Sequence, residues 1–341
     1  MKIVDITLTQ EKIRLKVPFI TALREVHFAE FVRLKMLCDD GRFAYGEAPA
    51  TKAITGETLE SITKAIESIK PFLVQKELRE ALEIVHQQSC GSSAKAALDM
   101  AIVTLLAQEK EQTLFEYFGI TDTTALQTDI TISLNSQEKM LREAKEAFEN
   151  GMDILKIKLG DDIAHAVAVT KLLAKELPKA TLLIDANQAW SEAESLEYLA
   201  AVEGLEIALL EQPVVAKDIA ALKRVTHATK LPILADEAVF TLEDVQNVVA
   251  LEAADMINIK LMKCGGVSKA VEILEYARKE GIKCMLGSMI EGPYSINITL
   301  YLAFAYRDVV QFIDLDSPLL YKEFPTELDF VYDGAVISLK A

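Results

Sequence analysis

Leu155-Lys156-Ile157-Lys158-Leu159-Gly160 predicts a β-strand with a lysine at every second position. Alternating residues of a strand point to opposite faces, so the two lysines share one face and the apolar residues share the other. In a closed barrel, one of these faces is the interior. Ammonium groups are costly to bury unless anions lie beside them. The stretch therefore predicts that acidic side chains from other strands accompany the two lysines.

The chain from about residue 127 onward alternates short apolar strands with amphipathic helices. We expect strands at 129–134, 154–158, 181–185, 207–211, 233–236, 256–260, 284–287 and 310–314. From Lys158 to Asp314, successive strands end 24 to 27 residues apart. Such regular spacing fits a closed TIM-like barrel of parallel strands better than an open sheet.

The first third has a different pattern. Residues 1–50 predict a β-meander that ends in a hairpin, with a loop at Pro18–Glu25, and residues 57–118 predict helices at 58–73, 77–88 and 92–109. A last hairpin, 330–332 with 336–339, is expected to return to this first unit. We therefore predict an α/β protein with an α+β domain at 1–125, a barrel at 126–318 and a C-terminal segment at 319–341 that returns to the first domain.

The composition excludes several classes of protein. The net charge of −16 argues against non-specific binding to nucleic acid or to an anionic membrane. No apolar run reaches the roughly 18 residues of a membrane span, and we expect no signal peptide. The cysteines are far apart and lack CxxC spacing, so we expect reduced thiols in a cytoplasmic protein. They are Cys38, Cys90, Cys264 and Cys284.

Three consecutive predicted strands end in a carboxylate: Asp185, Glu211 and Asp236. Residues at the carboxyl ends of barrel strands converge on one site. Like charges so close together repel unless a cation lies among them, and a set of oxygen ligands suits Mg²⁺ first and Mn²⁺ next. Asn187 and Asn258 can donate hydrogen bonds to these carboxylates. The alternative is that each acid caps a helix or forms an ordinary salt bridge.

Two lysines flank the three acids, because Lys158 lies one strand before them and Lys260 one strand after. A lysine acts as a base only when its pKa falls toward neutrality, and a metal ion, partial burial and the neighbouring ammonium of Lys156 all favour that fall. Glu237 is placed to pair with Lys260. The alternative is that the Lys-x-Lys strand carries two solvated charges.

Five motifs follow one another at the spacing of the strand ends: Lys156-Ile-Lys158, Asp185-Ala-Asn187, Glu211-Gln-Pro213, Ala235-Asp236-Glu237 and Asn258-Ile-Lys260. In this combination the chain resembles the enolase superfamily, in its muconate-lactonising subgroup. The resemblance implies a modified TIM barrel, (β/α)7β, with an α+β capping domain built from the N-terminal region and the C-terminal end. It also implies a metal ion on the three carboxylates and proton transfer by Lys158 and Lys260. Enzymes of this superfamily use a Lys or His base with Mg²⁺ to stabilise an ene-diolate.

Two further features resemble the dipeptide epimerases of this subgroup, among them those specific for L-Ala-D/L-Glu. Asp314-Leu-Asp316 ends the last barrel strand, where such a pair holds the substrate's free ammonium. Thr21-Ala22-Leu23-Arg24 and Ile54-Thr55-Gly56-Glu57 resemble the loops of the capping domain, in which the arginine binds the glutamate side chain. By the same resemblance the dipeptide would be lined by Thr131, Lys156, Ser288 and Ile290.

The implied activity is an isomerase reaction: Mg²⁺-dependent 1,1-proton transfer at the α-carbon of the C-terminal residue of a dipeptide. The expected reaction converts L-Ala-L-Glu to L-Ala-D-Glu in murein peptide metabolism. In this reaction the substrate's carboxylate would bind the metal, and the metal and Lys156 would stabilise the ene-diolate. One lysine on each face of the α-carbon would then suffice for inversion.

The alternatives use the same scaffold. They are o-succinylbenzoate synthase or N-succinylamino-acid racemase, whose substrates lack the free ammonium that Asp314 and Asp316 would bind, and a non-catalytic peptide-binding homologue, which would need no pair of lysine bases. Muconate cycloisomerisation is disfavoured because its substrate also lacks a free ammonium. The sequence leaves open the dipeptide's side chains, the metal and a homo-oligomeric state.

Overall fold

The computed structural model describes residues 1–22 and 24–340, so that Leu23 of the Thr21–Arg24 stretch and the terminal Ala341 lie outside it. The chain begins with a three-stranded antiparallel sheet in the order β1-β2-β3. Its strands are β1 (Ile3–Ile20), β2 (Glu25–Cys38) and β3 (Phe43–Pro49).

The first strand differs from the prediction. We expected a loop at Pro18–Glu25, whereas β1 runs on through Pro18 and pairs with β2 as far as Ile20 opposite Glu25, with a register shift between Arg14 and Phe19. Proline cannot donate to a ladder, but it is tolerated on an edge strand. Since β1 pairs within this sheet only with β2, its other edge leaves room for Pro18.

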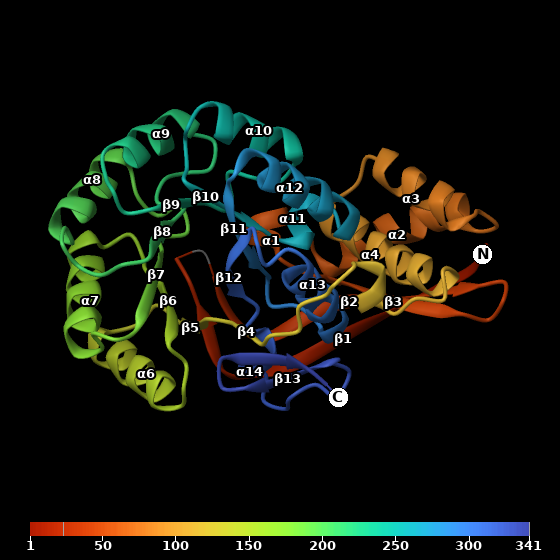
Figure 1. Ribbon diagram of the computed structural model, residues 1–341, viewed down its shortest axis with the longest axis horizontal. Coiled ribbons are helices and arrows are strands. Elements are labelled where there is room, and N and C mark those ends of the chain that lie inside the picture. Colours follow the sequence, from red (N-terminus) through yellow and green to blue (C-terminus); the bar gives the residue numbers. More distant parts are fainter. Residues whose placement is uncertain (23, 341) are drawn as a thin grey trace.

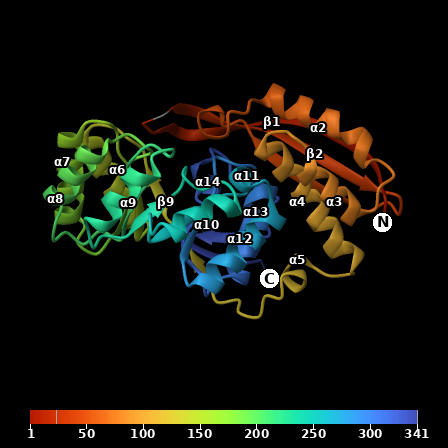
Figure 2. The same ribbon diagram turned by 90° about the horizontal axis from the view of Figure 1, so that it is seen from above.

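Helices cover this sheet on the side of the barrel (Figures 1 and 2). They are α2 (Leu59–Leu73), α3 (Leu78–Gln87) and α4 (Ser92–Glu109), so the three predicted helices agree within one residue. Two short helices precede and follow them in the chain, α1 (Lys52–Thr55) and α5 (Leu114–Tyr117), and α5 packs against α4 and α13 (Pro293–Ala305). Helix α4 is buried on both sides, because Ala97 and Leu98 pack with the sheet and Ala96 and Met100 with the barrel. A Cβ on Gly46 would lie 1.9 Å from the Ala97 carbonyl oxygen, so only glycine permits β3 to approach α4 this closely.

The barrel is an eight-stranded parallel sheet in the order β12-β11-β10-β9-β8-β7-β6-β5. Its bounds lie within two residues of the predicted ones, which confirms the α/β barrel with an α+β cap. The strands are β5 (Ile130–Ile132), β6 (Ile154–Lys158), β7 (Thr181–Asp185), β8 (Leu209–Glu211), β9 (Ile233–Ala235), β10 (Met256–Ile259), β11 (Lys283–Gly287) and β12 (Val310–Asp314).

Helices follow the strands around the outside of this sheet (Figure 1). They are α6 (Gln137–Glu149), α7 (Ile163–Glu176), α8 (Glu192–Ala201), α9 (Ile219–His227), α10 (Leu242–Ala250), α11 (Leu261–Cys264), α12 (Val267–Glu280), α13 (Pro293–Ala305) and α14 (Ser317–Leu320). Inside the sheet, a separate apolar cluster contains Leu183, Leu209, Leu234, Met256 and Met285. Because Asp185, Glu211 and Asp236 lie two residues further along the same strands, they stand above this cluster at the carboxyl ends.

The sheet is joined at its two outer strands by polar contacts. The Asp129 N–H donates to the Ile313 carbonyl at 3.0 Å, and the Thr131 N–H donates to Asp316 Oδ2 at 2.8 Å. The carboxylate of Asp316 thus takes the place of a strand carbonyl as the acceptor. This junction between β5 and β12 lies directly beside the cavity at the carboxyl ends of the strands.

The C-terminal hairpin is present, with β13 (Phe330–Asp333) and β14 (Val336–Leu339) close to the predicted bounds. It forms a small sheet with β4 (Leu126–Gln127) in the order β13-β14-β4. Just before it, Tyr321 bridges to Leu15, and the Lys322 N–H donates to the Arg14 carbonyl at 2.8 Å. The C-terminal segment therefore contacts both β1 and the start of the barrel.

The far end of the β1–β2 hairpin reaches over the barrel (Figure 2). The Leu134 N–H donates to the Ile20 carbonyl at 3.0 Å, and the Ile20 N–H donates to Ser133 Oγ at 3.1 Å. These bonds fix the hairpin end to the residues that follow β5. The cap thereby brings Phe19, Thr21 and Arg24 to the carboxyl ends of the strands.

Two expectations from composition can be compared with the structure. The four cysteines are free thiols, which agrees with the absence of a disulfide framework. Among the helices of residues 1–22 and 24–340, none has the length and apolar character that crossing a membrane requires.

Candidate active site at the barrel mouth

A cavity lies between the hairpin end and the carboxyl ends of the barrel strands. The cap contributes Phe19, Thr21, Arg24 and Ile54 to its wall. The barrel contributes Thr131, Lys158, Asn187, Asp236, Glu237, Lys260, Ser288, Met289, Ile290, Asp314, Asp316 and Ser317. The remaining predicted site residues are not part of this wall. Lys156 contacts Asp314 of the wall, Asp185 contacts Lys158 of the wall, and Glu211 and Asn258 are joined to the site through Lys156.

The two lysines of β6 contact the acids of β7, β8 and β12. Lys158 Nζ lies 2.5 Å from Asp185 Oδ2, as expected from their paired positions in adjacent strands. Lys156 Nζ lies 2.6 Å from Asp314 Oδ2, 2.7 Å from Glu211 Oε2 and 3.6 Å from Asp185 Oδ2. Burial lowers the pKa of Lys156, but these carboxylates raise it more, so this ammonium stays charged.

Two further lysines hold Asp236 from opposite sides. Lys260 Nζ lies 2.7 Å from Oδ2, and Lys263 Nζ lies 2.5 Å from Oδ1. Burial raises the pKa of Asp236, whereas the two ammonium groups lower it by more. The expected ion pair of Glu237 with Lys260 is not formed among the described residues, because Asp236 takes that lysine. Glu237 lines the same cavity and accepts a hydrogen bond from Asn187 instead.

The two predicted asparagines donate to the acids. Asn187 Nδ2 lies 3.3 Å from Asp185 Oδ2 and 3.4 Å from Glu237 Oε1, and Asn258 Nδ2 lies 2.9 Å from Glu211 Oε1. Asn187 has a φ of +45°, a conformation that asparagine tolerates better than most residues. Its N–H donates to Asp185 Oδ1 at 2.8 Å, which fixes the loop that follows the strand.

The site contains more buried acids than buried bases. The buried acids among the described residues of the site are Asp129, Asp185, Glu211, Asp236, Glu237, Asp314 and Asp316, and the buried bases are Lys156, Lys158, Lys260 and Lys263. A further buried acid, Glu291, interacts with Lys260 and Asp314. Buried charges need compensation by ions or protons, so this cluster calls for additional positive charge.

A divalent cation fits the group formed by Asp185, Glu211 and Asp236. Three buried oxygens beside them, Asn187 Oδ1, Glu237 Oε2 and Asn258 Oδ1, accept no hydrogen bond from the residues that the structure describes. Carboxylate and amide oxygens of this kind are the donors that Mg²⁺ prefers. The donor set and the excess of acids therefore both suit a magnesium ion.

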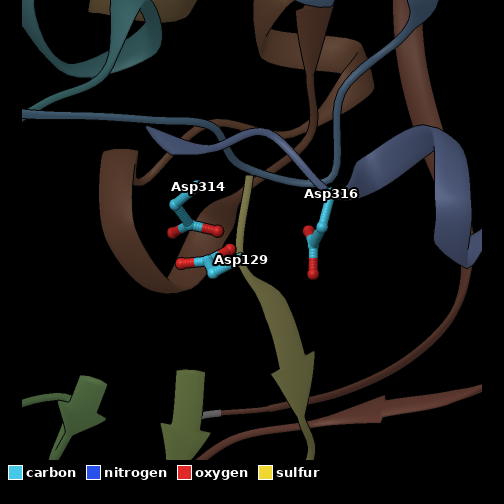
Figure 3. Close-up of side chains that lie close together, drawn as sticks. All are labelled: Asp129, Asp314 and Asp316. Carbon is cyan, nitrogen blue, oxygen red and sulfur yellow. The ribbon is translucent and has the colours of Figure 1, made fainter. Parts of the chain in front are cut away.

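A second group of acids could also hold a cation. One oxygen from each of Asp129, Asp314 and Asp316 lies within 4.8 Å of the others (Figure 3). All three are buried. Burial and the neighbouring Asp314 raise the pKa of Asp316 to about 6, while the Thr131 N–H opposes this rise. Lys156 connects the two groups through Asp314 and Glu211.

Sequence reasoning missed Asp129, Lys263 and the need for Gly287. Asp129 lies two residues before Thr131 and so on the same face of the strand, which is the pattern that could have revealed it. Lys263 follows Lys260 by one helical turn, beyond the predicted end of the strand. A Cβ on Gly287 would lie 2.7 Å from Asn258 Oδ1 and 3.0 Å from Lys260 Cε, so this glycine makes room for the lysine.

Arg24 brings a positive charge to the cap side of the cavity. Its side chain is half-buried, and burial lowers its pKa. Within residues 1–22 and 24–340, no carboxylate lies close enough to the Arg24 guanidinium to form an ion pair, for which the limit is 4.0 Å. A half-buried guanidinium without such a partner suits an anionic group of a ligand.

Comparisons with known proteins agree with this arrangement. Two family models match, "Mandelate racemase / muconate lactonizing enzyme, N-terminal domain" over residues 3–119 and "Enolase C-terminal domain-like" over residues 139–340. The chain belongs to the enolase superfamily. The predicted resemblance is thereby confirmed.

Individual relatives are similar over their full length. The chain is 57% identical over 338 residues to an L-amino acid-D/L-Glu epimerase of Sulfurimonas denitrificans, covering 99% of each chain. The structure of a substrate-liganded L-Ala-D/L-Glu epimerase from Bacillus subtilis superposes with a TM-score of 0.96 at 39% identity, covering 100% of this chain and 97% of that one. A dipeptide epimerase from Enterococcus faecalis, complexed with Mg and L-Leu-L-Tyr, gives 0.94 at 31% identity, covering 100% and 98%.

Proposed function

We propose that this chain is a Mg²⁺-dependent dipeptide epimerase, an isomerase that inverts the α-carbon of the C-terminal residue, with L-Ala-L-Glu to L-Ala-D-Glu as its main reaction. One observation carries the proposal: Lys158 and Lys260 line the same cavity from strands on either side of Asp185, Glu211 and Asp236. Inversion by proton transfer needs a base on one face of the carbon and an acid on the other, whereas binding alone needs neither.

Asp185, Glu211 and Asp236 would hold the metal ion, with Asn187, Asn258 and Glu237 beside them. A bound Mg²⁺ would supply positive charge that neutralises the substrate's carboxylate and favours the negative charge developing next to the α-carbon. Lys156 would add a permanent ammonium to the same region, because its neighbouring acids keep it charged.

The proton moves between the α-carbon and the two lysines. One lysine, as a neutral amine, takes the α-proton at its Nζ, and the other, as an ammonium, gives a proton to the opposite face. Burial lowers the pKa of Lys260, but Asp236, Glu211 and Asp314 together raise it by more, so Lys260 is charged while it is paired with Asp236. A lysine of this site can therefore become a base only when its partner carboxylate is engaged elsewhere.

Substrate binding follows from the remaining charges. Asp314 and Asp316 would bind the free ammonium, and Arg24 would bind the side-chain carboxylate of the epimerised residue. Thr131, Ser288 and Ile290 would line the dipeptide between these ends. An N-succinylated substrate suits this site less well, because its blocked amine would face two acids, and a protein that only binds peptides would not need two lysines.

Several broader predictions accompany the proposal. We divide the chain into a capping domain at 1–125, the barrel at 126–318 and a C-terminal segment at 319–341 that returns to the cap. A cytoplasmic location and a role in murein peptide metabolism rest on the sequence and on the family resemblance. A homo-oligomer is compatible with the proposed activity and can be tested by light scattering of the purified protein.

The test is proton NMR in D₂O with Mg²⁺ and a panel of L,L-dipeptides with acidic, apolar and basic C-terminal residues. We expect loss of the α-proton signal of the C-terminal residue of L-Ala-L-Glu, growth of the L,D diastereomer, and loss of both effects after chelation of the metal. Re-addition of Mg²⁺ should restore them.

Other outcomes would change the proposal in defined ways. Exchange only with apolar or basic dipeptides would keep the two-lysine reaction and remove Arg24 as the residue that selects glutamate. Exchange only with N-succinylated amino acids would replace the dipeptide by that substrate class. No exchange with any compound would overturn the enzymatic function.

A further inference from the structure

Glu47 is a buried acid of the cap that the proposed reaction does not use. It lies in β3 directly opposite Arg33 of β2, is fully buried, and does not line the cavity. Its Oε1 accepts a hydrogen bond from Arg33 Nε at 2.8 Å, and Arg33 Nη2 lies 2.8 Å from the same oxygen. This cross-strand ion pair leaves the second oxygen, Oε2, for other partners.

The second oxygen of Glu47 holds the start of a barrel helix. Oε2 accepts hydrogen bonds from the Tyr294 N–H at 2.8 Å and the Ser295 N–H at 3.1 Å, both in the first turn of α13. A Cβ on Gly292 would collide with this oxygen, so glycine at the helix start makes room for the carboxylate. The first N–H groups of a helix have no partner within the helix, and here an acid of the cap supplies one.

Ser295 connects this contact to the cavity wall. Its hydroxyl donates to Glu291 Oε2, and Glu291 Oε1 accepts a hydrogen bond from the Met289 N–H at 2.8 Å. Both Ser295 and Glu291 are buried. The segment 288–290, which follows β11, lines the cavity with all three of its residues. A continuous row of hydrogen bonds thus runs from Glu47 in the cap to the segment 288–290.

The barrel and an apolar cluster hold the same segment from other sides. The Ser288 N–H donates to the Asp314 carbonyl at 3.0 Å, and Ser317 Oγ donates to the Met289 carbonyl at 3.0 Å. Ile290 packs in a small apolar cluster, whose other buried members are Leu15, Ala29, Phe31 and Tyr321. Apolar contacts have no preferred direction, so the row of hydrogen bonds is what orients the segment relative to the cap.

We propose that Glu47 is a positioning residue through which the cap fixes the cavity wall at 288–290. Four N–H donors converge on its carboxylate, two from Arg33 and two from α13. A carboxylate satisfies both sides at once, whereas an amide has one acceptor oxygen and would direct its NH₂ group at the donors of the other side. The inference rests on the proposed function in one respect, namely that the segment 288–290 faces a dipeptide.

The first test needs no activity. Amide hydrogen exchange of peptides that cover residues 288–295 is measured by mass spectrometry in the parent protein and in Glu47→Gln. We expect exchange in these peptides to become about tenfold faster or more in the variant, because the N–H groups of Tyr294 and Ser295 lose their acceptor and the row that ends at Met289 is broken. Unchanged exchange in Glu47→Gln would overturn the proposal.

Asp99→Asn is the matched control. Asp99 is also a fully buried acid of the cap, and it accepts a hydrogen bond from the Ser268 N–H at 3.1 Å, at the start of the barrel helix α12. Its Oδ2 lies 2.8 Å from His86 Nε2, and no hydrogen bond of the described residues joins it to residues 288–295. Exchange at 288–295 should therefore stay at the rate of the parent protein. An equal increase in both variants would mean that the cap loosens as a whole, and would refute the specific role of Glu47.

The second test compares KM with kcat. The lysines of the reaction lie on other strands, so Glu47→Gln should raise KM for L-Ala-L-Glu about tenfold and change kcat by less than about threefold. Glu291→Gln should also raise KM, and the double variant should not exceed the larger single effect, because both acids belong to one row. An unchanged KM in Glu47→Gln, or effects on KM that multiply in the double variant, would refute the positioning role. If Glu47→Gln does not fold, Arg33→Met decides: it should raise KM about threefold or more, and an unchanged KM would overturn the proposal.

Failure of the proposed function can be told apart from failure of this inference. If no dipeptide exchanges its α-proton in the parent protein, the epimerase proposal fails, yet amide exchange still reports whether Glu47 holds the segment 288–290. If the parent is active and Glu47→Gln changes neither amide exchange nor KM, the inference fails and the epimerase proposal stands.

Discussion

Replacing Lys263 by methionine tests whether buried ammonium groups hold the acids of the site in place. The side chain is 2% exposed, and its Nζ donates to Asp236 Oδ1 and to the Asp236 carbonyl at 2.5 Å each, and to the Asn258 carbonyl at 2.9 Å. Methionine keeps the length of lysine and removes the charge and every donor.

The expected loss of stability follows from these contacts. Removing one partner of a buried ion pair costs about 3–5 kcal/mol, and each buried carbonyl left without its donor costs about 1–3 kcal/mol. Asp236 still keeps Lys260 at 2.7 Å, which reduces the first cost. We expect the free energy of unfolding to fall by about 4 kcal/mol, and Mg²⁺ affinity to fall about 10–100-fold because Asp236 loses its orientation.

Lys269→Met is the matched control. Lys269 pairs with Glu272 at 2.7 Å, as closely as the buried lysines pair with their acids, but both side chains are well exposed. Exposed ion pairs contribute about 0–1 kcal/mol, so this variant should resemble the parent protein in both stability and Mg²⁺ affinity.

The assay is urea denaturation followed by the fluorescence of Trp190, the only tryptophan of the chain. Trp190 is buried in the barrel, and its Nε1 donates to the Gly160 carbonyl at 2.8 Å, so its emission reports on the barrel itself. Mg²⁺ titration of each variant completes the experiment. If the free energies of unfolding of Lys263→Met and Lys269→Met differ by less than about 1 kcal/mol, the buried ammonium does not hold Asp236 in place.

Three further predictions concern the reaction. Lys158→Ala and Lys260→Ala should each lower epimerisation about 10²–10⁴-fold, while each still exchanges the α-proton of one diastereomer in D₂O; normal turnover in either variant would contradict a two-base reaction. Arg24→Met should lower kcat/KM for L-Ala-L-Glu about 10–150-fold, the value of a charged hydrogen bond, and leave L-Ala-L-Leu within about threefold; equal losses on both dipeptides would exclude a side-chain contact. Burial and Asp314 raise the pKa of Asp316 to about 6, so Asp316 is protonated below that pH and binds an ammonium poorly. KM should therefore rise about tenfold for each pH unit below 6 and be constant above pH 6. Asp314→Asn should move the pH at which KM begins to rise to a lower value. A KM that does not change with pH would argue against an ionised Asp316 in binding.

Local sequence was sufficient to predict the barrel strands and the convergence of the site residues at their carboxyl ends. Buried parallel strands are continuous apolar runs, and the helix after each strand sets a regular spacing, so the bounds of the barrel strands were predictable within two residues. Since the carboxyl ends of such strands meet, the same pattern placed Asp185, Glu211 and Asp236 at one mouth with Lys158 and Lys260 beside them.

Tertiary structure decided which acid each lysine holds. Lys260 contacts Asp236 rather than Glu237, Lys156 is shared by acids from three strands, and Lys263 reaches back to Asp236. These choices depend on the tilt and stagger of strands that lie far apart in the sequence, and no local pattern contains that information.

The sequence by itself determined the order of the elements, the family and the set of charged groups at the mouth, because each depends on residue type and spacing along the chain. Only the tertiary structure decided that β1 continues through Pro18 as an edge strand, that the hairpin end carries Arg24 over the barrel, and that Asp129 lies beside Asp314 with no hydrogen-bond partner among the described residues. The physical reason is the same in each case: long-range pairing sets burial, and burial decides which of these polar groups must find a partner, a cation or a proton.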